Sequence, residues 1–451
     1  MRDGFRSFLK LLEEKGEVLR IKEALSPVHE ISAAMRRLDD RSSQLVVFEN
    51  VCGYTVPVVW NLLGGKRVAT AMGIPANADV SAEFYRRTET RIKPRVMERG
   101  PVLDVEATGT DVLATIPVLT HHDLDASPYF TSAVTVARDP ATGLQSMGIH
   151  RLQVRGRGRL GILLNSPPLS EFWKKAESMG RDLEIAIVVG IDPLTWLASV
   201  TYAPQGIDKY EMAGALRQEA IEVVPCRKVG LTVPAEAEFL IEGKVLGGTR
   251  EVDGPCGEVN GVYGTFVSPA VEVLSISHRT NPIYHALLPR TLEEARLMSV
   301  SWGPQITRTL QSQFPWVANT HLDEYDYGTL IIQGTKPGDG APRELLEHTL
   351  ANFARIKTVV IVDRDIDIHD RREVALALAT RMQPDKDVLI KPNLSSYPLD
   401  PSATATSEGF RGSKIGFDAT KPLMNNEKYA KTRMPDEVDR EIETLLDRYL
   451  V

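Results

Sequence analysis

The chain has 451 residues, of which 43% are hydrophobic and 25% are charged. This length predicts two or three domains, and the composition excludes an intrinsically disordered protein. The formal net charge of −7 argues against general binding of nucleic acids, because phosphate backbones attract strongly basic surfaces. The three cysteines, Cys52, Cys226 and Cys256, lie far apart and form no CxxC pair, which is typical of a reducing compartment.

The sequence offers no segment suited to a membrane. Its first residues, MRDGFRSFLKLLEEKGE, contain acids and lack the apolar run of a signal peptide. The apolar stretch 185–200 is interrupted by Asp192 and Pro193 and is too short to cross a bilayer. We therefore expect a cytoplasmic protein that has no membrane partner.

Residues 1–103 are predicted to form an N-terminal α/β domain. Apolar residues recur at helical spacing over residues 5–12, and Gly16 follows where a helix C-cap belongs. Two strand-like runs and one helical run come next, at 45–48, 56–59 and 80–89.

Residues 104–300 are predicted to form a central split β-barrel. Short strand-like segments such as IHRLQV, LGILLN and EIAIVVGI are joined by turns, a pattern that favours a closed or split barrel. Two helices are expected to interrupt them, near 170–178 and 210–220. The whole chain is thus predicted to be of the α/β (α+β) class.

Residues 301–451 return to α/β alternation, with helices expected at 343–354 and 372–379 around a strand at 358–363. The proline-rich segment 391–406 is long enough to be a lid or an assembly arm. A last helix is expected after Pro435. It carries an apolar stripe that must pack against the same chain or a partner subunit: Val438, Ile442, Leu445, Leu446 and Tyr449.

Three short motifs resemble known binding sites but lack the neighbouring residues or elements that those sites need. The glycines 156, 158 and 161 match GxGxxG, but the strand-like LGILLN follows where a dinucleotide site needs a helix, so a hairpin turn is expected. The acids 363, 365 and 367 lack the glycine and closing glutamate of a calcium loop, and a solvated strand end facing Arg364 and Arg371 is expected instead. The segment 121–125, HHDLD, is interpreted as a hydrogen-bonded loop, because adjacent residues of an extended segment point to opposite sides.

One constellation has catalytic potential. Asp253 and Glu258 flank a Gly-Pro-x-Gly turn that can direct both carboxylates toward one pocket, although turn residues are also common in solvated loops. Arg151 lies on a strand-like segment of the same β-rich region, where a buried arginine is costly unless it meets an anion.

At these residues the sequence resembles the UbiD family of decarboxylases, which use prenylated FMN. The likeness extends over nearly the whole chain and appears as several blocks in order: THHDLDASPYFTSAVTVARDPATG, GIHR, EIAIVVGIDP, DGPCGE, NPIYHALLP, VVIVDRDIDI and SKIGFDATKP.

The resemblance implies an acid–arginine–acid network at Asp253, Arg151 and Glu258. Arg151 would bind the substrate carboxylate or the flavin through charge-assisted hydrogen bonds, and Glu258 would deliver the proton that replaces CO₂. Of two carboxylates in a dry pocket, one should have a raised pKa. We expect Asp253 to stay ionised on Arg151 and Glu258 to cycle its proton. Asp253 is one methylene shorter than the glutamate common in the family, so its reach depends on the backbone.

The resemblance also implies residues for the cofactor, a metal and the substrate. The cofactor residues would be Ser146, Ile149, His150, Arg151, Glu219 and Lys414. The family's metal ligands, an asparagine, a histidine and a glutamate, correspond to Ser146, about Pro168 and Glu219. Only Glu219 could persist as a ligand of Mn²⁺ or Mg²⁺, and K⁺ is the second ion that the resemblance implies. Substrate contacts are expected at Val259, His285 and Arg290, although a histidine such as His285 is more often a core residue.

The function implied is non-oxidative, reversible decarboxylation of an α,β-unsaturated, aromatic or heteroaromatic carboxylic acid. A flavin prenyltransferase would supply the cofactor, and a homodimer or homohexamer is expected. The replacements at Ser146 and Pro168 keep an alternative open, a flavin-free carboxylase component or a non-catalytic subunit of a larger assembly. An oxidoreductase with ordinary FMN is a third reading, and it would not need acids flanking Arg151.

Overall fold

The computed structural model describes residues 4–108, 112–201, 206–324, 326, 328–424, 426–432 and 434–446. The chain divides into two compact units. The first comprises residues 1–309, 322–327 and 398–402, and the second comprises residues 310–321, 328–397 and 403–451. Each unit is described by itself below.

The first unit begins with a small sheet and four helices. The parallel strands β1 (Val18–Leu25) and β2 (Leu45–Val51) are followed by antiparallel β3 (Val58–Trp60). The late strand β18 (Tyr284–His285) completes this sheet by pairing with β3. The predicted N-terminal α/β arrangement is therefore present, with one strand added from residues expected in the barrel. Its helices are α1 (Gly4–Glu14), α2 (Glu30–Asp39), α3 (Arg67–Met72) and α4 (Val80–Thr88).

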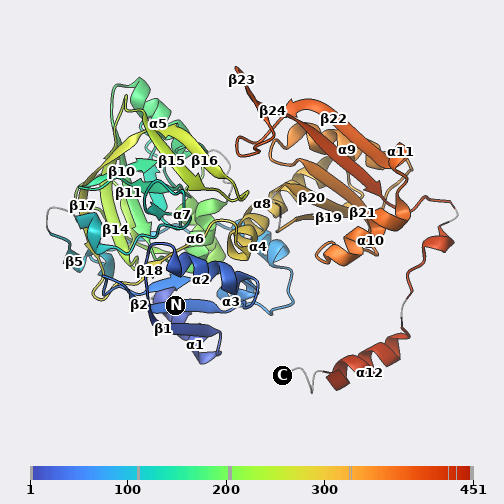
Figure 1. Ribbon diagram of the computed structural model, residues 1–451, viewed down its shortest axis with the longest axis horizontal. Coiled ribbons are helices and arrows are strands. Elements are labelled where there is room, and N and C mark those ends of the chain that lie inside the picture. Colours follow the sequence, from blue (N-terminus) through green and yellow to red (C-terminus); the bar gives the residue numbers. More distant parts are fainter. Residues whose placement is uncertain are drawn as a thin grey trace. The chain divides into compact units, whose positions relative to one another are not determined.

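The centre of the first unit is a curled nine-stranded sheet, as Figure 1 shows. Its strands follow the order β6-β9-β10-β17-β14-β11-β7-β8, and β5 pairs with β17. The sheet is an open path with β6 and β8 at its ends, in agreement with the predicted split barrel. The strands are β5 (Val105–Glu106), β6 (Tyr129–Phe130), β7 (Val134–Arg138), β8 (Gln145–Ile149), β9 (Leu152–Val154), β10 (Arg159–Ile162), β11 (Leu183–Val189), β14 (Phe239–Val245) and β17 (Ala270–His278).

Three helices and two small sheets accompany the barrel. Helices α6 (Pro193–Val200) and α7 (Lys209–Arg217) both start at aspartate caps, because Asp192 and Asp208 accept hydrogen bonds from backbone N–H groups of the first turn. Helix α5 (Leu169–Ser178) coincides with the expected one. The small sheets are β13-β12-β4 and the hairpin β15-β16, with β4 (Arg95–Val96), β12 (Glu222–Pro225), β13 (Thr232–Pro234), β15 (Glu251–Gly257) and β16 (Tyr263–Ser268).

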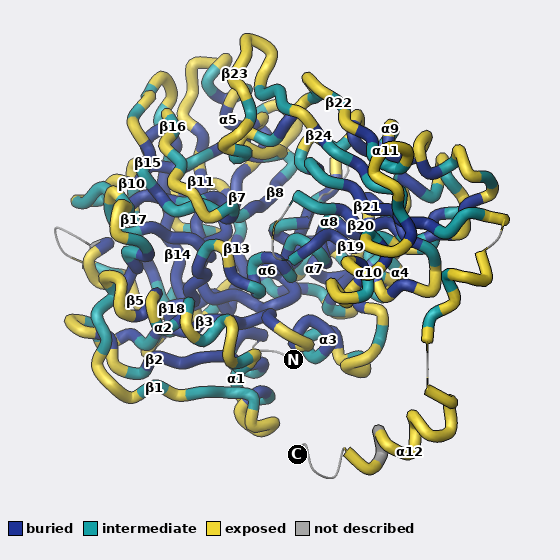
Figure 2. The backbone as a smooth tube through the Cα atoms, turned by 45° about the vertical axis from the view of Figure 1, so that its right-hand side comes forward, coloured by how far each residue is buried: buried dark blue, intermediate teal, exposed yellow. Residues whose placement is uncertain are grey.

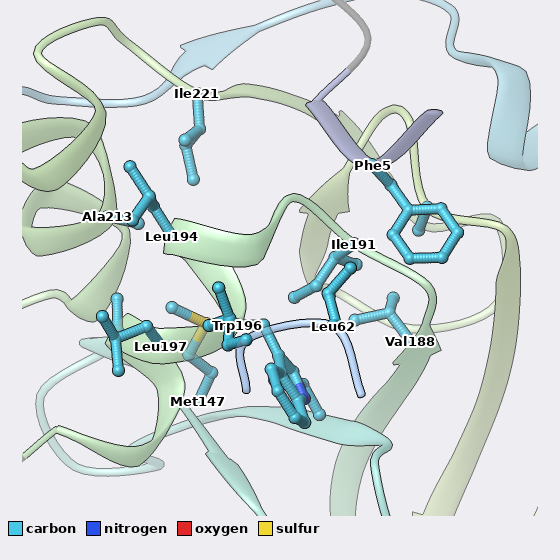
Figure 3. Close-up of a cluster of buried hydrophobic side chains, with 14 of the residues drawn as sticks. Phe5, Leu62, Met147, Val188, Ile191, Leu194, Trp196, Leu197, Ala213 and Ile221 are labelled. Atoms are coloured by element: carbon cyan, nitrogen blue, oxygen red, sulfur yellow. The ribbon is translucent and has the colours of Figure 1, made fainter. Parts of the chain in front are cut away.

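Strand β11 is buried on both faces and separates two hydrophobic clusters. Ala186 and Val188 belong to one cluster, whereas Ile185, Ile187 and Val189 belong to the other, which is the two-residue alternation of a strand. Figure 3 shows the first cluster, in which side chains from α1, β8, β11, α6 and α7 meet around Trp196. The dark tube of the central strands in Figure 2 follows the same buried positions.

The second unit is built around one mixed sheet with the order β19-β20-β21-β24-β22, to which β23 adds. Helix α8 (Leu292–Gln313) leads into it and contains the boundary predicted at residue 300, while the division between the units falls near residue 309. The strands are β19 (Val317–Leu322), β20 (Thr329–Gly334), β21 (Thr358–Asp363), β22 (Val388–Ser395), β23 (Thr404–Thr406) and β24 (Gly409–Ala419). The helices are α9 (Ala341–Asn352), α10 (Arg371–Arg381), α11 (Pro384–Asp387) and α12 (Asp436–Leu446).

Two local expectations for this unit need correction. The segment 391–406 is not one long loop, because β22 extends through Ser395 and β23 begins at Thr404. The carboxylates of Asp363 and Asp365 are paired with Arg381, and Asp365 also with Lys421, instead of facing Arg364 and Arg371. A buried arginine on the following helix satisfies these acids better than residues at the strand's own end.

The apolar stripe of α12 is exposed, as the yellow tube in Figure 2 shows. Val438, Ile442, Leu445 and Leu446 are 42–49% exposed, and Tyr449 lies outside the described residues. Within the part of the chain that the structure describes, none of the helices combines the length and apolar character needed to span a membrane.

The packing around α6 predicts a strong contrast between two leucines. Leu197 is 0% exposed and Leu124 is 57% exposed. We expect Leu197→Ala to lower the free energy of unfolding by about 2 to 5 kcal/mol, because it leaves a cavity, and Leu124→Ala by less than about 0.5 kcal/mol. Denaturant titration followed by tryptophan fluorescence measures both variants. Equal losses would show that the α6 cluster is not the stabilising core.

Candidate active site

Arg151 lies where the barrel is open, in the two-residue step between the end strand β8 and β9. Its side chain is 10% exposed. The guanidinium donates from Nε to Oδ1 of Asp253 at 2.8 Å and from Nη2 to the same carboxylate, while Nη1 donates to Oε1 of Glu258. The three residues that the sequence singled out are therefore in direct contact. The shorter side chain of Asp253 reaches Arg151.

A β-bulge brings the two acids to the same side of the β15–β16 hairpin. Asp253 pairs with Phe266 and Cys256 pairs with Gly264, so β15 spends three residue steps where β16 spends two. Residues five apart on a regular strand face opposite sides. The extra residue of the bulge reverses that parity, and Asp253 and Glu258 both turn toward Arg151.

Two glycines allow the backbone to take this path. Gly254 has φ of 114°, and a Cβ placed on it would lie 2.5 Å from the carbonyl oxygen of Gly264. A Cβ on Gly257 would lie 2.3 Å from Nδ1 of His122. The glycines of the Gly-Pro-x-Gly motif are thus required by close approach of the backbone to its neighbours.

The hairpin is fixed from two directions. Asp125 accepts hydrogen bonds from the backbone of Gly257 at 2.9 Å and of His122 at 2.9 Å. Burial alone would raise the pKa of Asp125, but the hydrogen bonds from His122 and Gly257 hold it below its ordinary value. At the other end, Arg155 and Arg159 are paired with Glu251. The glycine-rich segment at 156–161 is indeed a hairpin between β9 and β10, and its arginines position β15.

The loop at 121–125 has the structural role expected for it. Nδ1 of His121 lies 2.9 Å from Oγ of Ser32, and Nε2 lies 3.3 Å from Oγ1 of Thr131. Tyr263 of β16 donates a hydrogen bond to Asp123. The loop therefore supports the hairpin that carries the two acids.

The electrostatics of the site separate the roles of the acids. Burial raises the pKa of Glu258 above its ordinary value, Arg151 opposes that rise, and the carboxylates of Asp253 and Asp125 add to it. Asp253 is 0% exposed and has the greater number of contacts with the guanidinium. Arg151 also lies over the rings of Tyr129 and Phe266, at 5.6 Å and 5.2 Å from their centroids. The geometry suits a fixed Arg151–Asp253 pair next to an acid that exchanges a proton.

The expected cofactor residues Ser146 and Ile149 lie on β8, and His150 follows them directly before Arg151. Ser146 lines a pocket of about 400 Å³ together with Pro168, Phe172 and Ile207. Its Oγ is buried and has no hydrogen-bond partner among the described residues. Burial lowers the pKa of His150 to about 4, and its Nδ1 lies 3.1 Å from the carbonyl oxygen of Leu163. The unpartnered hydroxyl of Ser146 thus lines a pocket, and Ser146 precedes Arg151 by five residues. This arrangement suits an elongated polar ligand.

The expected substrate residues lie in different surroundings. Val259 follows Glu258 and packs with Ala295 and Leu399. Arg290 is exposed beside the turn of the hairpin, since a Cβ on Gly261 would lie 3.1 Å from its Cδ and Nη1. His285 is 0% exposed and packs edge-on against Trp196 at 4.5 Å between ring centroids, so it occupies a core position.

Lys414 and Glu219 belong to surroundings different from those of Ser146. Lys414 belongs to the second unit and donates to the carbonyl oxygens of Leu350 and Phe353. Glu219 is exposed beyond the C-terminal end of α7. Helix α7 has nine residues, about 13 Å at the usual rise, and the Ser146 pocket is lined by residues 206 and 207 just before its other end. Ser146 and Pro168 line the same pocket, and the described residues hold no cluster of three or more His, Cys, Asp or Glu side chains that could bind a metal ion.

Comparison with known proteins identifies the family. Models of the N-terminal, Rift-related and C-terminal domains of 3-octaprenyl-4-hydroxybenzoate carboxy-lyase match residues 9–83, 95–291 and 296–419. The chain belongs to the UbiD family. It is accordingly a decarboxylase, a carboxy-lyase, with the mixed α/β fold of UbiD-class enzymes.

Individual relatives cover nearly the full chain. Anhydromevalonate phosphate decarboxylase from Methanothermobacter thermautotrophicus is 33% identical over 94% of this chain and 99% of its own length. The enzyme of the same name from Methanosarcina mazei is 32% identical over 96% of this chain and 100% of its own length. The solved UbiD-class enzyme HmfF from Pelotomaculum thermopropionicum, in complex with FMN, is 36% identical with a TM-score of 0.90, covering 97% of this chain and 98% of that one. Vanillic acid decarboxylase from Sedimentibacter hydroxybenzoicus is 29% identical with a TM-score of 0.86, covering 99% of this chain and 100% of that one.

Sequence reasoning missed three residues at the site. Tyr129 and Phe266 cover the guanidinium of Arg151, and Lys209 is buried at the start of α7. The alternation of β16 could have placed Phe266 beside Asp253, given the pairing register. No comparable signal marks Lys209, because a lysine in the first turn of a helix is normally on the surface.

The close approach at Gly254 predicts a steric penalty that a matched glycine lacks. Gly248 also has a positive φ, 72°, but a Cβ there meets nothing within 4 Å. We expect Gly254→Ala to lower the free energy of unfolding by at least about 1 kcal/mol more than Gly248→Ala, because the added methyl group must displace the β16 backbone. Thermal and denaturant unfolding of both variants measures the difference, and equal penalties would contradict the proposed bulge geometry.

Proposed function

We propose that this enzyme removes CO₂ from an unsaturated, aromatic or heteroaromatic carboxylic acid, with prenylated FMN as its cofactor and Arg151, Asp253 and Glu258 as its catalytic residues. The observation that carries the proposal is the contact of one guanidinium with both acids of the bulged hairpin. If Asp253 and Glu258 were solvated residues of a surface loop, neither would need to contact Arg151.

Arg151 binds and orients the anionic groups. Asp253 fixes the guanidinium through Nε and Nη2, which leaves the Nη1 edge to Glu258 and to an incoming carboxylate. A planar guanidinium can meet two oxygens at once and stays charged at any working pH. The low exposure of the group strengthens its interaction with an anion, because little water screens it.

Glu258 supplies the proton. When the bond between the carboxylate carbon and the substrate breaks, CO₂ leaves without the electron pair, and the vacated carbon must receive one proton. A protonated Glu258 transfers its proton to that carbon and is afterwards reprotonated from solvent. The raised pKa of Glu258, caused mainly by burial, keeps the acid available in its neutral form.

The cofactor assignment rests on relatives and on the pocket. HmfF is described in complex with FMN, and its dimeric form with prenylated FMN. Prenylated FMN, when bound, supplies the electron sink that side chains lack. The buried, unpartnered hydroxyl of Ser146 and the pocket around it suit the polar end of such a cofactor. The alternative, a flavin-free carboxylase component or non-catalytic subunit, would leave these features and the acid pair without a use.

The substrate proposal stays at the level of a class. Val259 and Arg290 border the hairpin turn next to Glu258, and Arg290 is exposed enough to bind a second anionic group of the acid. His285, which we expected as a third contact, would act only through its packing with Trp196. Relatives named for anhydromevalonate phosphate and vanillic acid provide the first compounds to assay.

We further propose a homodimer or homohexamer in the cytoplasm and a flavin prenyltransferase as the supplier of the cofactor. The exposed apolar stripe of α12 supports an oligomer, since four large apolar side chains remain in contact with solvent in the single chain.

The first test of function is Glu258→Gln. Produced together with a flavin prenyltransferase, the variant should bind the same cofactor as the parent but release CO₂ about 10² to 10⁴ times more slowly, because it lacks the transferable proton. Absorbance and mass of the released cofactor check loading, and Glu272→Gln, an exposed glutamate of β17, is the matched control. Parental turnover by a loaded Glu258→Gln would refute the assignment. A parent that carries no chromophore would favour the flavin-free alternative.

The raised pKa of Glu258 predicts the pH dependence of the rate. The group is active when protonated, so kcat should be constant below its pKa and fall as the pH rises through it. Because burial raises that pKa, the fall should come at a higher pH than for an exposed glutamate. A pH profile of kcat with the loaded enzyme measures this limb. The limb should be absent in Glu258→Gln, and a rate that instead increases through this region would assign Glu258 the role of a base.

A further inference from the structure

Lys209 is a buried cation without an anionic partner. It is the first residue of α7 and is 4% exposed. Its Nζ donates to the carbonyl oxygen of Ser199, the last turn of α6, at 2.7 Å. None of the described carboxylates lies within ion-pair distance of this ammonium, and burial lowers the pKa of Lys209 to about 7. Buried charges are normally paired, so this one calls for an anion that the described residues do not provide.

The ammonium lies close to the face of β8 that carries Ser146. A Cβ on Gly148 would be 3.9 Å from the same Ser199 oxygen and 3.2 Å from Nε2 of His150. Ser146 and Gly148 share one face of β8 and lie two residues, about 7 Å, apart. The Oγ of Ser146 is buried and unpartnered among the described residues. A cation and a free hydroxyl thus lie beside one pocket.

The charges of the pocket show what Lys209 contributes. Its lining carries two carboxylates, Asp139 and Glu171, and one ammonium, Lys175. Lys175 is already paired with Asp139 at 2.7 Å, and Glu171 is exposed. Without Lys209, the pocket would therefore present a net negative charge to an incoming anion.

A divalent metal does not explain the arrangement. Pro168 has no side-chain donor, Glu219 lies at the far end of α7, and the described residues contain no metal-binding cluster. The positive charge at this end of helix α7 is instead the ammonium of Lys209, the first residue of the helix.

We propose that Lys209 binds the phosphate group of the flavin directly and supplies the positive charge that a divalent metal would otherwise provide. The inference rests on the proposed function, because the phosphate is that of the flavin. A five-carbon ribityl chain joins the phosphate to the ring system, which suits one subsite at Ser146 and another at Arg151, five residues along the chain. Ser146 donates its hydroxyl to the same phosphate. A phosphate ester of the substrate offers the same chemistry, and the experiment separates the two sources.

The test compares FMN with riboflavin, which lacks only the phosphate. Dissociation constants are measured by quenching of flavin fluorescence, in buffer treated with EDTA, for the parent and for Lys209→Gln. Glutamine keeps a hydrogen-bond donor for the Ser199 carbonyl and removes the charge. We expect the parent to prefer FMN, and Lys209→Gln to lose about tenfold to a hundredfold in affinity for FMN with unchanged affinity for riboflavin.

Control variants distinguish a specific effect from a general one. Lys175→Gln removes the paired lysine of the same pocket, and Lys174→Gln removes an exposed lysine of α5. Both should keep most of the preference for FMN, and an unchanged affinity of Lys209→Gln for riboflavin shows that it is folded. If Lys209→Gln is insoluble, the parent enzyme alone tests the inference. Its preference for FMN over riboflavin must then be the same in EDTA and with added Mn²⁺.

Several results would overturn the inference. These are an equal FMN-to-riboflavin ratio in parent and Lys209→Gln, loss of the ratio in Lys175→Gln instead, or a preference that appears only with Mn²⁺ or Mg²⁺. If Lys209→Gln binds FMN normally but has a raised KM for a phosphorylated substrate alone, the lysine serves the substrate and the inference is wrong. A parent that binds neither flavin removes the flavin from the proposed function as well.

Discussion

The ion pair between Arg151 and Asp253 is the constraint on which the site depends. The side chain of Arg151 is 10% exposed, and a guanidinium so far from water must be paired with a negative charge. The fully buried carboxylate of Asp253 supplies that charge and accepts hydrogen bonds from Nε and Nη2 of Arg151. The step between β8 and β9 places the side chain of Arg151 at an edge of the barrel, where the β15–β16 hairpin can meet it. Glu258 then enters a region already neutralised by the pair. Burial raises the pKa of Glu258 more than the attraction of Arg151 lowers it, and repulsion from Asp253 adds to the rise.

The rest of the first unit holds the hairpin in register. A bulge is needed to turn both acids inward, and a bulge weakens the pairing of a two-stranded ribbon, which is marginally stable by itself. The chain compensates with contacts at both ends of β15. Arg155 and Arg159 from the β9–β10 turn bind Glu251 at its start, and Asp125 binds the backbone of Gly257 at its end. Arg155, Arg159 and Asp125 take no part in the reaction, but they hold the hairpin that places the two acids beside Arg151.

Sequence patterns predicted the elements well and the side-chain environments less well. The helices near 170–178 and 372–379 and the hairpin at 156–161 follow from periodicity and glycine placement, which are local properties. The grouping of Asp253 with Glu258 was expected from the turn between them, but their common orientation arises from a pairing register with β16 that no local pattern contains. Motif spacing suggested Glu219 as a metal ligand. Its exposure beyond the end of α7 depends on how that helix packs, which the spacing does not reveal. For the same reason Lys209, which looks like a surface residue of a first helical turn, was not expected to be buried.

The two cations of the site differ in a way that separates catalysis from binding. Arg151 is compensated within the chain by its pairs with Asp253 and Glu258. Lys209 has no such compensation from the part of the chain that the structure describes, and its burial is unfavourable until an anion arrives. A cation of that kind favours a ligand that remains bound through many turnovers, because losing the ligand restores the unpaired charge. The arrangement therefore matches a resident cofactor at the Ser146 end and an exchanging acid at the Arg151 end. An ammonium fixed by the fold also makes that retention independent of the supply of metal ions.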